Sequence, residues 1–274
     1  MSIAEAVLLG FIQGLTEFLP VSSSGHLVLA GHFLGVKKTG IAFEVFLHFG
    51  TLMAIVTVFR RMIWEIIISC VGGTEAFLRG DTERRRAHHR GLRLALWIVV
   101  GSIPAAVFGI LFKNSVEEAF SNPTLVSICL IATGLILWST RFFTLADRTI
   151  GGGNALLIGL AQALAILPGI SRSGATISTA LIRGINGEEA VTFSFLLAIP
   201  AILGATLLEV VHLLSHAPSH SELSTWIFGA VAAYISGYFA ITLLLNTVRR
   251  GKLDYFSYYC WGVGLSGLIL RGAF

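Results

Sequence analysis

The segment EFLPVSSSGH, residues Glu17–His26, places several reactive side chains in an otherwise apolar stretch. It contains a carboxylate, three consecutive serines and an imidazole around a proline, which interrupts a helix. A carboxylate or an imidazole beside a serine hydroxyl can act as a general base or a general acid. Glu17 and His26 are therefore candidate catalytic residues, with His26 placed to orient or deprotonate one of the serines.

Gln13 lies four residues before Glu17, so a helix would carry both side chains on one face, one turn apart. Their oxygen atoms are of the type that Mg²⁺ and Ca²⁺ prefer as ligands. The pair predicts acid–base chemistry at Glu17 or a divalent-cation site formed with Gln13. Glu44 and His48 have the same spacing in the next apolar segment, where we expect a supporting or structural pair.

A second polar segment repeats the first. GFIQGLTEFLPVSSSG, residues 10–25, aligns with GLAQALAILPGISRSG, residues 159–174, with a one-residue slip on each side of the proline. The repeat indicates two related halves, residues 1–148 and 149–274. The equivalent positions are Gly10 and Gly159, Gln13 and Gln162, Pro20 and Pro168, and Ser22–Gly25 and Ser171–Gly174.

The interruptions at Pro20 and at Pro168-Gly169 predict that a new helix starts just after each one. The first N–H groups of a helix lack internal partners and carry a partial positive charge, so such an N-terminus can bind an anion. Serine hydroxyls at these positions either cap the helix or donate to phosphate oxygens. From the residues alone both interpretations stay open.

Arg172 is the most informative single residue in the repeat. An arginine at membrane depth costs about 2.5–3.5 kcal/mol on insertion scales, and no acidic residue lies within ten positions of it. Its partner must be Glu17, Glu44 or an anion supplied by a ligand. Because a planar guanidinium suits bidentate phosphate recognition, we interpret Arg172 as an anion-binding residue.

The composition places these residues in a membrane protein. The chain has 274 residues, of which 55% are hydrophobic and 12% charged, whereas soluble domains carry about 25% charged residues. Six apolar runs approach the ~20 residues of a membrane-spanning helix. They are Ile41–Phe59, Leu92–Phe112, Leu125–Trp138, Ala190–Val211, Trp226–Leu245 and Phe256–Leu270.

The basic residues indicate one orientation, because Lys and Arg concentrate in cytoplasmic loops. This distribution accounts for the net charge of +4 without a nucleic-acid partner, which we do not expect. The cytoplasmic groups would be Arg60, Arg61, Arg79, Arg84, Arg85, Arg86, Arg90 and Arg93, then Arg141, Arg148 and Arg183, and then Arg249, Arg250 and Lys252; the opposite loops hold Lys37, Lys38, Lys113 and Arg271.

These patterns predict an all-α integral membrane protein with an inverted-topology repeat. Each half would contain three spanning helices and one re-entrant helical hairpin, at about residues 3–35 and 153–185. Three crossings in the first half turn the second half upside down, and interrupted helices of such repeats meet near the midplane. Gly10-x-x-x-Gly14 predicts close helix packing, and Tyr255, Tyr258, Tyr259 and Trp261 predict an interfacial aromatic belt.

The motifs GLTEFLPVSSSGH and LPGISRSGATIS resemble the two signature motifs of the undecaprenyl pyrophosphate phosphatases of the bacitracin-resistance type. The resemblance extends over essentially the whole chain, including FEV at Phe43 and FSFLLAIP at Phe193. It implies a bacterial inner-membrane enzyme with six spans and two re-entrant hairpins, whose site faces the outer side. Such enzymes hydrolyse the C55 lipid pyrophosphate to the monophosphate carrier of cell-wall synthesis, with Mg²⁺ or Ca²⁺.

The resemblance also implies roles for single residues. Gln13 and Glu17 occupy the (E/Q)xxxE pair of the first motif, and glutamine in place of glutamate at the first position gives Glu17 more weight. Ser23 and His26 match the serine and the histidine of that motif. The expected phosphate-binding residues are Ser22, Ser24, Ser171, Arg172, Ser173 and Thr176.

In the implied reaction, Ser23 attacks the terminal phosphorus while Glu17 or His26 takes its proton, or water attacks directly. The partners would be a polyprenyl pyrophosphate and membrane lipids, and a homodimer is compatible with the sequence. The alternative from another class is a transporter or flippase of polyprenyl phosphates that uses the same midplane site. The set of serine, histidine and glutamate favours an enzyme, because transport needs no nucleophile.

Overall fold

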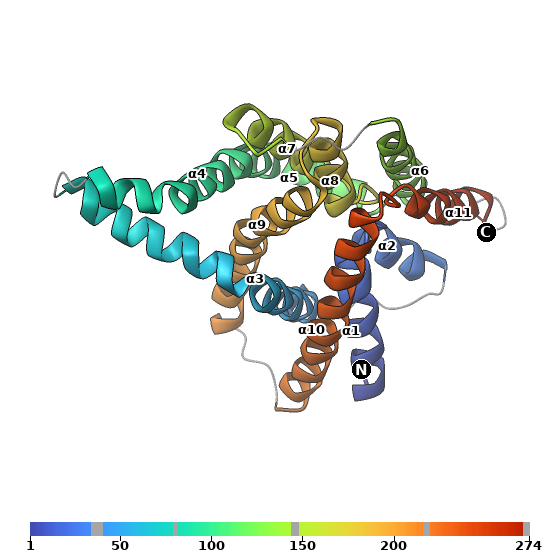
Figure 1. Ribbon diagram of the computed structural model, residues 1–274. Coiled ribbons are helices and arrows are strands. Elements are labelled where there is room, and N and C mark those ends of the chain that lie inside the picture. Colours follow the sequence, from blue (N-terminus) through green and yellow to red (C-terminus); the bar gives the residue numbers. More distant parts are fainter. Residues whose placement is uncertain (34–40, 79–81, 144–147, 216–219, 271–274) are drawn as a thin grey trace.

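The computed structural model describes residues 1–33, 41–78, 82–143, 148–215 and 220–270, which form helices and no strand (Figure 1). The all-α fold class is therefore confirmed. The helices are α1 (Ile3–Phe18), α2 (Ser23–Phe33), α3 (Ile41–Leu78), α4 (Thr82–Leu111), α5 (Lys113–Ala119), α6 (Pro123–Ser139), η1 (Thr140–Phe142), α7 (Gly152–Leu164), α8 (Arg172–Ile182), α9 (Gly187–Ser215), α10 (His220–Arg249) and α11 (Tyr255–Leu270).

Five of the six expected spans are long and apolar enough to cross a membrane. They lie in α3, α4, α6 with η1, α9 and α10, at Ala42–Gly73, His88–Leu111, Pro123–Phe142, Gly187–Gly204 and Glu222–Arg249. The sixth expected span coincides with α11, which has 16 residues, fewer than the ~20 of a typical span. The chain is a multi-pass membrane protein.

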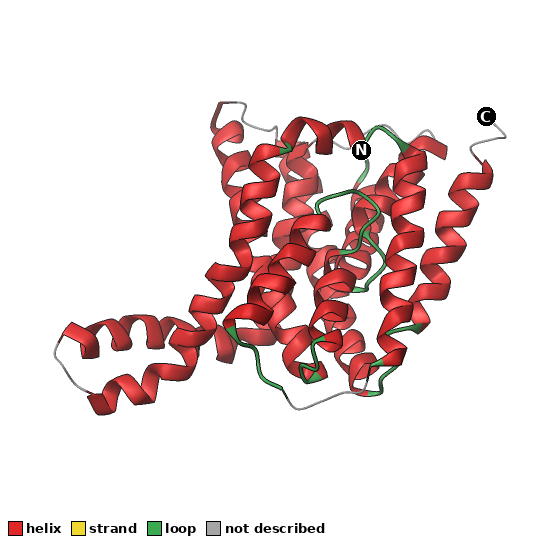
Figure 2. Ribbon diagram, turned by 90° about the horizontal axis from the view of Figure 1, so that it is seen from above, coloured by secondary structure: helices red, strands yellow, loops and turns green. Residues whose placement is uncertain are grey.

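Helix α3 changes direction at Phe59, whose backbone angles of −100° and 17° depart from helical values. Beyond this point α3 and the first part of α4 leave the bundle together as a hairpin (Figures 1 and 2). Figure 2 shows the N-terminus at the end of the bundle opposite this hairpin. The two ends of the bundle are therefore different surfaces, one of which carries the arginine-rich hairpin.

Helix α1 packs closely against α10, as Gly10 and Gly14 predicted. A Cβ atom at Gly10 would lie 2.1 Å from the carbonyl oxygen of Gly229, and one at Gly14 would lie 2.1 Å from Oγ of Ser236. Helix α7 packs in the same way against α4. There, a Cβ atom at Gly159 would lie 2.3 Å from the carbonyl oxygen of Gly101.

The two interruptions form two turns, Leu19–Ser22 between α1 and α2 and residues 165–171 between α7 and α8. Each turn touches the start of the helix that follows the other turn: a Cβ atom at Gly25 of α2 would lie 3.1 Å from Cα of Gly169, and one at Gly174 of α8 would lie 3.3 Å from Cβ of Pro20. Residues 34–35 of the expected first hairpin, about 3–35, lie outside the described residues. Within the described residues, both turns are held by helices from elsewhere in the chain.

Two side chains hold the turns in place. Thr133 of α6 donates to the carbonyl oxygen of Gly169 at 2.8 Å and accepts from the amide of Ser171 at 3.0 Å. The thiol of Cys260 in α11 donates to the carbonyl oxygen of Pro20 at 3.6 Å. The largest group of buried apolar side chains, which includes Phe18, lies directly beside these turns.

Candidate active site

The structure brings Glu17 and Arg172 into direct contact, although 155 positions separate them in the sequence. Glu17 lies in the last turn of α1 and Arg172 begins α8, so the chain breaks next to them bring these side chains toward each other. Nη2 of Arg172 donates to Oε1 of Glu17. The side chain of Glu17 is 7% exposed and that of Arg172 is 21% exposed, which makes this a largely buried ion pair.

The second carboxylate oxygen of Glu17 accepts two hydrogen bonds. Oγ of Ser23 donates to Oε2 at 2.8 Å, and Nε2 of Gln13 donates to the same atom at 3.0 Å. A general base must lie within about 2.6–3.2 Å of the atom that it deprotonates. Glu17 meets this requirement for Ser23.

His26 has a different environment from the one that its position near the serines suggested. Its Nδ1 lies 2.8 Å from the carbonyl oxygen of Ser22, which can only accept, so Nδ1 carries the proton. Its Nε2 then accepts from the hydroxyl of Tyr259 at 2.8 Å, and the two rings stack with 5.5 Å between their centroids. Both ring nitrogens of His26 are thus engaged away from Ser23.

Two of the serines cap the helices that follow the turns. Oγ of Ser22 accepts from the amide of Gly25 at 3.3 Å, and Oγ of Ser171 accepts from the amide of Gly174 at 3.1 Å. Ser22 also has a φ of +66°. Residues other than glycine rarely adopt this backbone conformation, and those that do tend to cluster at functional sites. Both serines are buried, so capping is the role that their contacts display.

The remaining candidate phosphate-binding residues differ in their access. Ser24 is partly exposed, whereas Ser173 and Thr176 are buried. The hydroxyl of Thr176 donates to the carbonyl oxygen of Arg172 at 2.8 Å and shares a hydrogen bond with Ser194. Thr176 therefore bonds to the first turn of its own helix, α8. Phosphate binding by the hydroxyls of Ser24, Ser173 and Thr176 stays a prediction.

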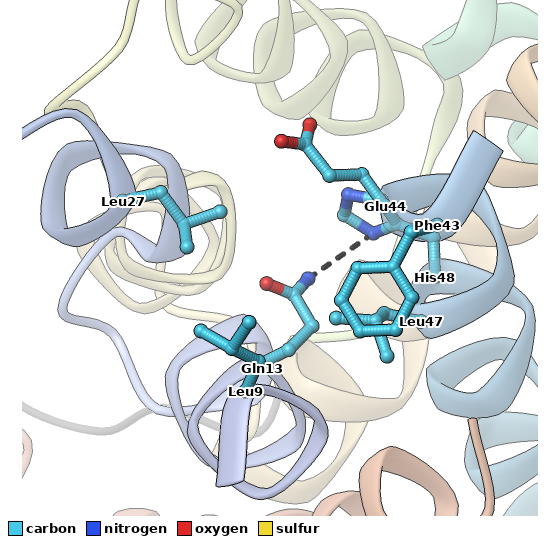
Figure 3. Close-up of a pocket in the computed structure, with 7 residues that line it drawn as sticks. All are labelled: Leu9, Gln13, Leu27, Phe43, Glu44, Leu47 and His48. Carbon is cyan, nitrogen blue, oxygen red and sulfur yellow. Dashed lines mark hydrogen bonds between the residues drawn. The ribbon is translucent and has the colours of Figure 1, made fainter. Parts of the chain in front are cut away.

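A small pocket adjoins Glu17 (Figure 3). It is lined by Leu9, Gln13, Leu27, Phe43, Glu44, Leu47 and His48 and has a volume of about 10 Å³, which is close to the minimum for one water molecule. Nε2 of Gln13 donates to Nδ1 of His48 at 3.3 Å, so Nδ1 lacks a proton. Nδ1 of His48 also lies 3.8 Å from Oε2 of Glu17.

The donor atoms of this pocket fit a divalent cation only in part. The described residues contain no group of three or more His, Cys, Asp or Glu side chains that could enclose a metal. They do offer hard oxygen ligands in Glu17 and in the carbonyl oxygen of Gln13, which Figure 3 shows pointing away from His48. Mg²⁺ commonly uses one or two carboxylates and completes its shell with water and substrate phosphates. A cation held by both residues requires the Gln13 amide to turn, because its Nε2 and not its oxygen faces Glu17.

Comparison with known proteins identifies the family. The sequence profile described as bacitracin resistance protein BacA matches residues 6–266. The chain belongs to this family. The undecaprenyl-diphosphatase of Salinibacter ruber is 45% identical over 268 residues, covering 97% of this chain and 98% of that protein. The undecaprenyl-diphosphatase of Korarchaeum cryptofilum is 42% identical over 271 residues, covering 98% and 100%.

Three residues of this BacA-family site were not assigned to it from the sequence. His48 was expected only in a supporting pair, and its spacing from Glu44 was the available signal. Tyr259 was assigned to an aromatic belt, but its hydroxyl donates to His26. Thr133 had no signal at all, because a threonine in an apolar helix usually bonds its own backbone.

Proposed function

We propose that this chain is an undecaprenyl-diphosphatase. It hydrolyses undecaprenyl diphosphate to undecaprenyl phosphate and phosphate, which returns the lipid carrier to cell-wall synthesis and confers resistance to bacitracin. The observation that carries this proposal is the contact of Glu17 with both Ser23 and Arg172. It joins a base, a nucleophile and an anion-binding group in one buried site, and the named relatives support the substrate.

Arg172 and the first turns of α2 and α8 would bind the diphosphate. In the described part of the chain, Glu17 is the only acceptor of the Arg172 guanidinium, which has five N–H donors, so others are available for phosphate oxygens. Glu17 and the carbonyl oxygen of Gln13 would hold a Mg²⁺ or Ca²⁺ ion. When bound, this ion would neutralise part of the negative charge of the phosphates.

Ser23 acts as the nucleophile in the proposed reaction. Its Oγ forms a bond to the terminal phosphorus, its proton passes to Oε2 of Glu17, and the bond to the undecaprenyl phosphate oxygen breaks. Water then attacks the phosphoserine, and Ser23 recovers a proton through Glu17 as phosphate leaves. Phosphoryl transfer depends mainly on position and charge neutralisation, which Arg172 and Glu17 provide.

His26 positions this site rather than deprotonating Ser23. Its proton at Nδ1 fixes the carbonyl oxygen of Ser22, which lies beside Ser23 in the strained turn. Tyr259 in turn fixes the ring of His26. The contacts of His26 therefore favour Glu17 as the base.

The fold that carries this site is an inverted repeat with six spans and two re-entrant hairpins, divided near residue 148. Reciprocal contacts between helices of the two halves support this arrangement. Helix α1 packs on α10 of the other half, and α7 packs on α4 in return. The first turn is held from α11 and the second from α6, as a pseudo-twofold relation between the halves requires.

The protein lies in the bacterial inner membrane with its site open to the outer side. The arginine-rich hairpin of α3 and α4 supports this orientation, because positive residues stay in the cytoplasm. The start of α1 lies at the opposite end of the bundle (Figure 2). The pocket of Gln13 and His48 is formed from α1, the first turns of α3 and Leu27 of α2.

Phosphate release in detergent tests the activity, because no membrane separates two sides there. The purified protein should release phosphate from undecaprenyl diphosphate, and Glu17→Gln should lower the rate at least about a thousandfold. Glu117→Gln, which removes an exposed carboxylate of α5, is the matched control. No release by the wild-type protein, together with lipid transfer across vesicles, would instead identify a transporter.

Acid quenching tests the nucleophile. Enzyme that is mixed with substrate labelled with ³²P at the terminal phosphorus should carry label on Ser23, and Ser23→Ala should abolish both label and activity. Ser121→Ala, which removes an exposed hydroxyl between α5 and α6, is the matched control. Turnover without label on Ser23 would show that water attacks directly.

A further inference from the structure

A second, larger pocket lies away from Glu17. It has a volume of about 530 Å³ and is lined by Met62, His89, Arg90, Arg93, Leu94, Trp97, Thr149, Ile150, Asn186, Glu188, Glu189, Thr192 and Phe193. Met62 follows His48 by 14 positions on α3, which corresponds to roughly 21 Å along a helix. The two pockets are therefore separate sites, and the larger one lies at the base of the arginine-rich hairpin.

The charges around this pocket favour an anion. Arg90 and Arg93 are exposed and have no acidic partner among the described residues. Of the two glutamates of the lining, Glu188 pairs with Arg249 at 3.0 Å, whereas Glu189 accepts from the amide of Ile150 at 3.0 Å and keeps its negative charge. The two unpaired arginines therefore exceed the one unpaired carboxylate, and the balance of charge at the pocket is positive.

Trp97 adds an independent observation. Its indole N–H is buried and has no hydrogen-bond partner among the described residues, although buried donors are usually paired. The ring lies against α7, because a Cβ atom at Gly152 would lie 2.8 Å from it. An indole nitrogen can only donate, but this one has almost no exposed surface, so a phosphate oxygen in the pocket would become its acceptor only after the ring turns.

The neighbouring surface indicates where a hydrocarbon chain would lie. Leu96, Val99 and Ile103 are 51%, 59% and 53% exposed and follow one another along α4. This apolar stripe begins next to Arg93 and Trp97. A phosphate that binds those two residues can therefore keep an attached chain in the lipid.

We propose that this pocket binds the phosphate monoester head of a membrane lipid. Arg90 and Arg93 donate to the phosphate oxygens, and the indole N–H of Trp97 joins them once its ring turns toward the pocket. The chain follows Leu96, Val99 and Ile103. This site requires no residue of the Glu17 site and no hydrolysis. Free phosphate has the same chemistry, so an experiment must separate the two sources.

Calorimetric titration of the full-length protein in detergent tests the proposal, with farnesyl phosphate in one arm and inorganic phosphate in the other. All measurements use an Arg172→Ala background, which removes the main anion-binding side chain of the other site. We expect Arg90→Gln with Arg93→Gln to weaken farnesyl phosphate binding at least about tenfold, because guanidinium–phosphate bonds are charge-assisted. Arg60→Gln with Arg61→Gln, exposed positions outside the pocket, is the charge-matched control and should change affinity less than about twofold.

Unchanged farnesyl phosphate affinity in the Arg90 and Arg93 variant would overturn the proposal. Equal affinity for inorganic and farnesyl phosphate would assign the pocket to free phosphate and overturn the lipid source. Trp97→Phe, which keeps the ring and removes the donor, should also weaken binding. Hydrolysis is measured separately with Arg172 intact, so failure of this pocket and failure of the proposed enzyme give different results.

Discussion

At the scale of single residues, the site depends on one carboxylate that has three different donors. Glu17 binds the guanidinium of Arg172, the hydroxyl of Ser23 and the amide of Gln13. The arginine and the serine compete for no common oxygen, because each contacts a different one. Glu17 can therefore accept the proton of Ser23 while Arg172 still fixes its position.

Replacement of Arg172 by alanine should remove the principal phosphate-binding charge. We expect kcat/KM for phosphate release to fall at least about a thousandfold, or about 4 kcal/mol in transition-state stabilisation. Arg172→Lys should recover part of the activity, because it keeps the charge but loses bidentate geometry. Arg183→Ala at the other end of α8 is the control, and wild-type turnover in Arg172→Ala would contradict the proposed site.

Gln13→Glu tests whether this position faces a divalent cation. A second carboxylate adds a hard oxygen ligand, so activity should persist and half-maximal rate should occur at a lower Mg²⁺ concentration. The measurement is a Mg²⁺ titration after treatment with a chelator. Unchanged Mg²⁺ dependence would argue against a ligand at residue 13, and Gln162→Glu at the equivalent position of the repeat separates local from general effects.

The sequence predicted those parts of the site that depend on the local spacing of residues or on the small number of charged residues in apolar segments. Gln13 and Glu17 share a face because the helical period requires it. Arg172 could be matched to Glu17 because so few acidic residues lie in apolar segments. The contact of Tyr259 with His26 spans 233 positions and follows from helix packing, which neither local sequence dictates.

At the scale of elements, the two turns are stable because other helices satisfy their backbone groups. Interrupted helices leave N–H and C=O groups that lipid cannot bind. Thr133 satisfies one of each in the second turn, and Cys260 satisfies a carbonyl in the first. The proposed catalytic residues thus owe their positions to α6 and α11.

Thr133→Val keeps the shape of the side chain but removes its hydroxyl. The amide of Ser171 and the carbonyl of Gly169 would lose a partner, which costs about 1–3 kcal/mol for a buried group. We expect a lower melting temperature and a lower kcat, because α8 begins at Arg172. Thr133→Ser should restore both quantities, and a normal melting temperature in Thr133→Val would contradict this role.

Gly10→Ala tests the close contact between α1 and α10. Its Cβ atom would meet the carbonyl oxygen of Gly229 at 2.1 Å, so the helices must separate, at a cost of about 1–3 kcal/mol. Thermal unfolding in detergent should show a lower melting temperature. Gly262→Ala in α11, where a Cβ atom meets nothing within 4 Å, should leave it unchanged or raise it.

The spacing of Gly10 and Gly14 predicted close packing but could not name the partner helix. Gly10 and Gly14 show only that one face of α1 admits another helix. The partner positions Gly229 and Ser236 lie in a segment that contains many other small residues, so nothing in the sequence singles them out. The length of α3 was also not predicted. The expected apolar run ends at Phe59, where the helix bends, but the helix itself continues to Leu78. Helical propensity continues through the bend, whereas the hydrophobic pattern changes there.

At the scale of the whole molecule, each half completes the other. Helices α1 and α10 come from different halves of the proposed repeat, as do α7 and α4, and the proposed site uses Glu17 from one half and Arg172 from the other. Ser23 and Arg172 occupy equivalent positions of the repeat. The two copies therefore supply different chemistry to a single site.

Thiol labelling of intact cells tests the proposed orientation. In a variant without Cys70 that keeps the buried Cys129 and Cys260, an impermeant reagent should label Asn114→Cys, which lies in α5 on the expected outer side. It should label Arg250→Cys only after the membrane is opened, because that residue follows α10 at the expected cytoplasmic side. The reverse pattern would invert the whole arrangement.

The pairing of α1 with α10 also has a consequence for synthesis. Gly10 and Gly229 are 219 positions apart, and at about 5–20 residues per second translation takes roughly 10–45 s to cover that distance. During this time α1 can already contact α2 and α3, through Ser23 and His48, but it lacks both α10 and the guanidinium of Arg172. The burial of Glu17 is therefore completed only when nearly the entire polypeptide has left the ribosome.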